Sequence, residues 1–143
     1  MSAESEVRAA SEKFYSALNH MATGDAGPMA EAWSHGATVT TMHPLGGRET
    51  GWDKVGPTWS EVAKLASGGQ VKLSDQHIQA AGDMAYEVGI EKGHITMGGQ
   101  KVNIDHRVTN VYRRHDGTGK IVHHHPDLSP AMIELLSSLQ AKK

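Results

Sequence analysis

The segment Val111-Tyr-Arg-Arg-His-Asp-Gly-Thr-Gly-Lys-Ile-Val-His-His-His125 says most about the fold. Its centre, Asp116-Gly-Thr-Gly119, has the composition of a tight turn between two antiparallel strands. Apolar residues recur at even positions before the turn and define one face of a long strand: Val102, Ile104, Val108 and Tyr112. The segment therefore predicts a hairpin in an antiparallel sheet.

Two further strands are predicted before this hairpin, over residues 71–81 and from residue 84 onward. In the first, the apolar phase changes between Leu73 and Ile78, which indicates a β-bulge. The second alternates apolar residues at even positions with Glu87 and Glu91 at odd positions. We expect the even-numbered face of this strand to be the buried one.

Helical periodicity accounts for most of the remaining chain. Helices are predicted over residues 5–21, 28–33 and 53–66, and from Ser129-Pro130 onward, with Asp53 as the N-cap of the third. Residues 37–41 and 48–50 read as short strands. The predicted helices and the long predicted strands occupy different parts of the chain and do not alternate, which favours an α+β fold. A helix across a curved antiparallel sheet would form a cone with an apolar pocket.

Composition excludes several functional classes. The chain has 143 residues, no cysteine and a formal net charge of −2, without a basic cluster for nucleic acid. No apolar run reaches the roughly 18 residues of a membrane-spanning helix. Residues 1–6 are acidic rather than apolar, unlike a secretory signal. We expect a cytoplasmic protein of one domain, residues 1–143, with no nucleic-acid or membrane partner.

The hairpin segment resembles the closing hairpin of the SnoaL-like, nuclear transport factor 2-like superfamily. It is similar in particular to bacterial relatives of the calcium/calmodulin-dependent kinase II association domain. Residues 38–53 and 19–25 carry the same likeness. The resemblance implies a cystatin-like cone, in which N-terminal helices pack on a curved antiparallel sheet and a C-terminal helix follows. It also implies a bacterial protein with a small-molecule pocket.

The functional residues of known relatives are mostly missing here. Ketosteroid isomerases of this superfamily use an Asp base on the first strand and a Tyr and an Asp as oxyanion donors. The first-strand segment here is Thr40-Thr41-Met42-His43. The Tyr position aligns with Phe14, next to Tyr15, and the second Asp position aligns with Val111, next to Asn110. This comparison argues against classical ketosteroid isomerisation.

The anion-binding residues of the kinase association domains are absent as well. Their positions align with Val55, Val88, Asn110 and Pro126. The resemblance therefore implies a more neutral pocket, for a small apolar or polycyclic molecule, and no cofactor.

Polar residues on predicted inward faces are the candidate site. His106 and Asn110 interrupt the apolar face of their strand, and His124 shares the inward side of its strand with position 126. In the leading hypothesis, His124 or His43 is the base of a cofactor-independent proton transfer, and Asn110 and Tyr15 orient a carbonyl or enolate oxygen. The expected ligand-binding residues are Tyr15, Trp33, Trp59, Val88, His106 and Tyr112.

Two other functions remain open. One is a non-catalytic association module. The other is a metal site at His123 and His125, which lie two apart on a strand, although no metal ligand is assigned. Whichever function applies, we predict a homodimer through the outer sheet face, which carries Thr109, Val111, His123 and His125.

Overall fold

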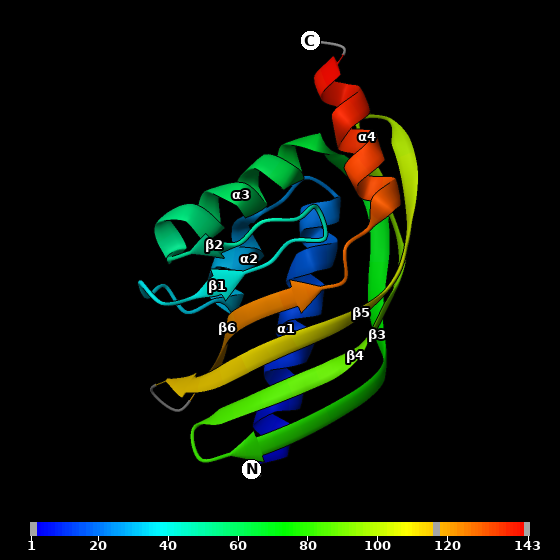
Figure 1. The fold of residues 1–143 in the computed structure, drawn as a ribbon. Helices are drawn as coiled ribbons and strands as arrows, with labels where there is room; N and C mark the ends of the chain where they lie inside the picture. The colour runs from blue at the N-terminus through cyan, green and yellow to red at the C-terminus, as the bar shows by residue number, and fades with distance from the viewer. Residues whose placement is uncertain (1–2, 116–117, 142–143) are drawn as a thin grey trace.

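The computed structural model describes residues 3–115 and 118–141, and within them the chain forms four helices and six strands (Figure 1). The helices are α1 (Ala3–Ala22), α2 (Gly27–Ala32), α3 (Trp52–Leu65) and α4 (Pro130–Ala141). The strands are β1 (Thr40–Thr41), β2 (Glu49–Thr50), β3 (Ala66–Ala81), β4 (Met84–Met97), β5 (Gln100–His115) and β6 (Thr118–Pro126). This is the expected α+β cone.

The strands form one curved sheet in the order β2-β1-β6-β5-β4-β3. Neighbouring strands are antiparallel except β1 and β6, which pair in parallel with Thr40 opposite His123. The predicted hairpin is β5–β6, which pairs up to His115 and Thr118. Residues 116–117 of its expected turn lie outside the described residues.

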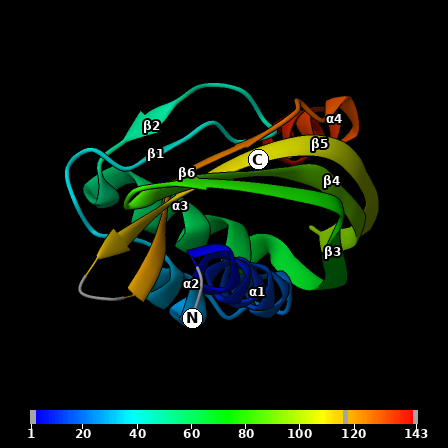
Figure 2. The same ribbon diagram turned by 90° about the horizontal axis from the view of Figure 1, so that it is seen from below.

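Helices α1, α2 and α3 lie on one side of the sheet (Figure 2). The apolar stripe of α1 recurs every three or four residues and is buried, as its periodicity predicts: Val7, Ala10, Phe14, Leu18 and Met21. This stripe packs on β3 and β6 and forms the centre of the core with Trp33 and Trp59. Helix α4 follows β6, and Met132 and Leu135 on it are buried.

Two bulges decide which side chains point inward. The predicted bulge in β3 is confirmed, because the pairing with β4 shifts between Ser74 and His77. A second irregularity lies in the β5–β6 pairing, where Val111 faces His123 but Tyr112 faces Ile121. The extra residue in β6 lets both Ile121 and His124 point inward, although they are three positions apart.

The expected orientation of β4 is wrong. Its odd-numbered residues point inward, so Glu87 and Glu91 are buried, while Met84 and Tyr86 are 45% and 42% exposed. The cause is the pairing with β5, which sets Glu87 opposite Asn110 and Glu91 opposite His106. Directly opposed residues share a face of the sheet. His106 and Asn110 point inward from β5, so the β4 residues directly opposite them point inward as well.

The N-cap of α3 differs from the prediction, whereas the N-cap of α4 agrees with it. The N-cap of α3 is Gly51, at φ 89°, rather than Asp53. A side chain at position 51 would adopt an unfavourable backbone conformation and approach the Ala37 carbonyl oxygen. At α4, the Ser129 hydroxyl accepts the Met132 amide at 3.2 Å, as expected of an N-cap. Over the described residues, no helix has the length and apolar character needed to cross a bilayer.

Candidate functional site

A partly open cavity of about 60 Å³ lies between the sheet, α1, α3 and α4. Its wall is mostly apolar: Leu18, Met21, Pro44, Leu45, Trp59, Val62, Val71, Ile95, Met97, Ile104, Pro126 and Met132. Four titratable side chains complete the wall: His43, Glu91, His106 and His124. A volume of about 150 Å³ is enough for a benzene ring. A larger ligand therefore requires side chains to move, and flexible methionines supply that freedom.

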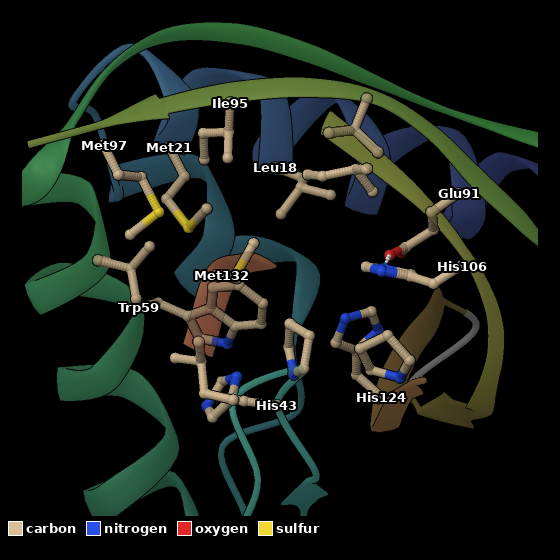
Figure 3. A pocket seen from close by; sticks show the side chains of 16 residues that line it. Leu18, Met21, His43, Trp59, Glu91, Ile95, Met97, His106, His124 and Met132 are labelled. Carbon is tan, nitrogen blue, oxygen red and sulfur yellow. Dashed lines mark hydrogen bonds and ion pairs between the residues drawn. The ribbon is translucent and has the colours of Figure 1, made fainter. Parts of the chain in front are cut away.

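Glu91 is the charged group of this wall. It is 3% exposed and accepts hydrogen bonds from His106 Nε2 at 2.7 Å and from the Tyr15 hydroxyl at 2.9 Å. Burial would raise the pKa of Glu91, but the His106 hydrogen bond, the nearby histidines and the Tyr15 hydrogen bond bring it below its ordinary value. Figure 3 shows the Glu91–His106 pair at one side of the cavity and Met97 at the other.

Tyr15 and Asn110 extend the hydrogen-bond network beyond the Glu91–His106 pair. Burial, and next the charge of Glu91, raise the pKa of the Tyr15 phenol, which therefore stays protonated and donates to the carboxylate. The same hydroxyl accepts from Asn110 Nδ2 at 3.0 Å. Asn110 Nδ2 also donates to Glu87 Oε1 at 3.0 Å. Neither Tyr15 nor Asn110 lines the cavity.

His124 is buried and neutral. Burial is the main cause that lowers its pKa to about 4. Its Nδ1 lies 2.6 Å from Asn110 Oδ1, which can only accept, so the single proton of the neutral ring is on Nδ1. Among the described residues no side chain engages Nε2 of His124. The cavity wall therefore contains an imidazole whose Nε2 lone pair is available.

His43 lies between β1 and β2. Its Nε2 is 3.0 Å from Glu49 Oε1, and Thr58 donates to the other oxygen of Glu49 at 2.6 Å. Burial lowers the pKa of His43, although Glu49 opposes that shift. The ring packs edge-on against Trp59 with centroids 5.3 Å apart. His43 is thus held in one orientation at the cavity wall.

The structure brings some of the predicted site residues together and separates others. His43, Trp59, His106 and His124 line the cavity. Trp33 and Tyr112 are in the core, 1% exposed each, and do not reach the cavity. Val88 lies on the outer face beside Thr109 and His125, because the inward face of β4 is the odd-numbered one. The structure therefore places Val88, Trp33 and Tyr112, like Tyr15, outside the wall of this cavity.

Glu87 and Glu91 were missed by the sequence analysis, which read them as solvent-facing. A signal for them exists in the two-residue turn Gly98-Gly99. That turn pairs Met97 with Gln100, and counting back places Glu91 opposite His106 and Glu87 opposite Asn110. A register fixed by a short turn identifies cross-strand partners without any tertiary information.

Metal ligation finds little support in this geometry. Over residues 3–115 and 118–141, no three His, Asp or Glu side chains are grouped as a metal site requires. His123 and His125 lie on the outer face with ring centroids 5.8 Å apart, and His123 Nδ1 is 2.7 Å from the Thr40 hydroxyl.

Comparisons with solved structures show the same fold. A proposed dehydratase of the nuclear transport factor 2-like family from Streptomyces avermitilis is 24% identical, with a TM-score of 0.76 over 89% of this chain and 96% of that chain. A proposed calcium/calmodulin-dependent protein kinase type II association domain from Thiobacillus denitrificans is also 24% identical, with a TM-score of 0.70 over 85% and 94%. A proposed ketosteroid isomerase from Shewanella frigidimarina is 17% identical, with a TM-score of 0.67 over 85% and 94%.

A search among curated proteins finds no match. The family model described as "SnoaL-like domain" matches residues 7–132. This range runs from the first buried residue of α1 to the methionine of α4 at the cavity wall, so it includes every strand of the cone. With the cone fold and a family-model match over most of its length, the chain belongs to the SnoaL-like domain family.

Proposed function

We propose that the protein is a cofactor-independent enzyme that moves a proton on a small, mainly apolar substrate bearing a carbonyl or hydroxyl group. The observation that supports this most directly is the available Nε2 of neutral His124 in an apolar cavity, beside the Glu91–His106 pair. In this proposal His124 Nε2 is the general base. Tyr15 and Asn110 do not contact the substrate but hold Glu91 and His124 in place.

A base with a pKa of about 4 suits an acidic C–H bond next to a carbonyl. It is unprotonated throughout the neutral range, and ketosteroid isomerases use a base of about the same strength. His124 would take the proton from the carbon next to the carbonyl. Return of that proton from His124 to another carbon is an isomerisation. Its transfer from His124 to a hydroxyl on the next carbon, which then leaves as water, is a dehydration.

The names of two structural relatives agree with this chemistry, since one is a proposed dehydratase and another a proposed ketosteroid isomerase. The apolar wall and the small volume of about 60 Å³ favour a compact substrate over a polycyclic one. Because the Glu91 carboxylate lies in this wall, 2.7 Å from His106 Nε2, the cavity disfavours an anionic ligand.

The test uses two small probes that give one product. 3-Cyclohexen-1-one isomerises, and 3-hydroxycyclohexanone loses water, to give conjugated 2-cyclohexen-1-one, whose ultraviolet absorbance reports turnover. His124→Gln should slow turnover about 10²–10⁴-fold, the usual contribution of a positioned base. His125→Gln is the matched control, since His125 is the next residue and is exposed on the outer face. Equal rates for wild type and His124→Gln would count against the proposal.

We also propose that the outer face of the sheet pairs with a second copy. Tyr86 is 42% exposed there, and Val88, Ile90 and Val111 are only half-buried around it. An exposed apolar patch of this kind is typical of an interface. A large sheet contact without ligand binding or turnover would instead favour the association module.

A further inference from the structure

Glu87 is a second buried carboxylate to which the proposed reaction assigns no role. It is fully buried, and it does not line the cavity. Three donors surround it: Oε1 accepts from Asn110 Nδ2 at 3.0 Å and from the Tyr112 hydroxyl at 2.8 Å, and Oε2 accepts from Gln76 Nε2 at 2.6 Å. Every one of these contacts is directed toward the carboxylate.

The direction of these bonds fixes the orientation of Asn110. An ionised carboxylate only accepts, so the amide nitrogen of Asn110 must face Glu87. The amide oxygen then faces His124 Nδ1, 2.6 Å away. An amide oxygen only accepts, so Nδ1 must carry the proton and Nε2 is left with its lone pair.

Tyr15 supports the same orientation from another direction. The Tyr15 hydroxyl donates its single proton to Glu91 Oε2. Toward Asn110 it can therefore only accept, and the group that donates to it is Asn110 Nδ2. Both carboxylates of β4 therefore favour one orientation of one amide. Glu87 does so directly, and Glu91 does so through the tyrosine.

We propose that Glu87 is a positioning residue, which through Asn110 holds His124 in the tautomer with the proton on Nδ1 and so leaves Nε2 as the base at the cavity. The catalytic part of this inference rests on the proposed function, whereas the tautomer itself does not. Glu87 acts here through the direction of its hydrogen bonds, not by contact with a ligand.

The Glu87→Gln variant changes the direction of the hydrogen bonds at position 87 while it keeps the size and shape of the side chain. Arg8 donates to Gln76 Oε1 at 2.6 Å, so Gln76 must keep its nitrogen toward position 87. The oxygen of the new amide then faces Gln76, and its nitrogen faces Asn110. Asn110 then reverses, and the Tyr15 hydroxyl turns from Glu91 to donate to the Asn110 oxygen. The Asn110 nitrogen faces His124, and the ring must move its proton to Nε2.

The readout is the pair of ring nitrogen shifts of His124 in protein labelled with ¹⁵N-histidine, measured by long-range ¹H–¹⁵N correlation at pH 7. Wild type should show a protonated Nδ1 and an unprotonated Nε2. Glu87→Gln should show the reverse, and its turnover of 3-hydroxycyclohexanone should fall about 10²–10⁴-fold, as for His124→Gln. Tyr112→Phe removes another donor to the same carboxylate oxygen and should leave the tautomer unchanged.

A swap of the two side chains provides the rescue. In Gln76→Glu/Glu87→Gln, the new carboxylate accepts from Arg8 and from the nitrogen of the new amide, whose oxygen again faces Asn110. The wild-type tautomer should return, and turnover should recover to within a few fold of wild type.

Two results would overturn the inference: a wild-type tautomer in folded Glu87→Gln, or a swap that does not restore it. If Glu87→Gln does not fold, the wild-type spectrum still tests the inference, because a protonated Nε2 in wild-type His124 would contradict it. If the tautomer responds as expected while His124→Gln retains full turnover, the proposed function fails and the positioning by Glu87 stands.

Discussion

Removal of His106 should destabilise the protein strongly, because it leaves the Glu91 carboxylate buried with one partner fewer. The two side chains are 8% and 4% exposed and 2.7 Å apart. After His106→Leu the carboxylate keeps the Tyr15 hydroxyl at 2.9 Å but loses its charge-assisted partner. Breaking a buried pair in this way costs about 3–5 kcal/mol of unfolding free energy.

Urea unfolding followed by tryptophan fluorescence measures this loss, since Trp33 and Trp59 are buried and their emission reports the core. With a urea dependence of about 2 kcal/mol per molar, the midpoint should fall by about 1.5–2.5 M. Arg107→Leu is the control on the adjacent residue. Arg107 is exposed and pairs with Asp127 at the surface, so its midpoint should hardly change.

The double variant Glu91→Leu/His106→Leu tests whether the uncompensated charge is the cause. Removing the carboxylate as well should recover most of the lost stability, because no charge stays buried. Recovery should be incomplete, since the Tyr15 hydroxyl then lacks its acceptor. A midpoint for His106→Leu within about 0.5 M of wild type, or a double variant as unstable as the sum of the single variants, would refute the reasoning.

Three further predictions concern ligand binding, acid stability and assembly. His124→Phe should weaken the binding of cyclohexanol by about 1–3 kcal/mol in a calorimetric titration, because the ligand hydroxyl loses Nε2 as its acceptor. His123→Ala, on the outer face, should bind like wild type; weaker binding by His123→Ala and not by His124→Phe would contradict the placement of His124 in the cavity. The pKa of His124 is about 4 when folded and near 6.5 when unfolded, so the unfolded chain binds more protons between these values, and stability is full above pH 6.5 and falls toward pH 4. The part of this loss that is due to His124 amounts to about 3 kcal/mol and should be missing in His124→Gln. If wild type and His124→Gln lose equal stability between pH 7.5 and pH 4.5 in thermal melts, the burial of a neutral ring is contradicted. Sedimentation at tens of micromolar should show a homodimer for wild type and a monomer for Val111→Lys on the outer face, whereas a wild-type monomer at this concentration would rule the interface out.

Much of the fold could be predicted from the sequence, because it depends on local pattern. The periodicity of α1, the bulge between Leu73 and Ile78, and the cap at Ser129 each involve residues close together in the chain. The β5–β6 hairpin is equally local. Its sequence, with the family resemblance, was enough to expect His124 inward and His123 outward. His124 is buried, whereas His123 is only half-buried.

The candidate site could be predicted only in part. The sequence suggested His43, His106 and His124, which do line the cavity. It assigned Glu87 and Glu91 to solvent, because the apolar residues of that strand alternate at the even positions. The partners of these carboxylates come from elsewhere in the chain: Tyr15 is 76 residues from Glu91, and Asn110 is 23 residues from Glu87. Burial of these carboxylates becomes favourable only once such donors are in place.

The sequence by itself therefore determined the element order, the α+β class and the apolar face of each helix, since neighbouring residues settle these. Only the tertiary structure decided which face of β4 points inward, because that depends on the strand beside it. It also decided which polar groups contact the cavity and which stand behind it. Hydrophobic periodicity identifies surfaces that avoid water, whereas a buried hydrogen-bond network exists only when distant donors and acceptors meet at the right distance and in the right direction.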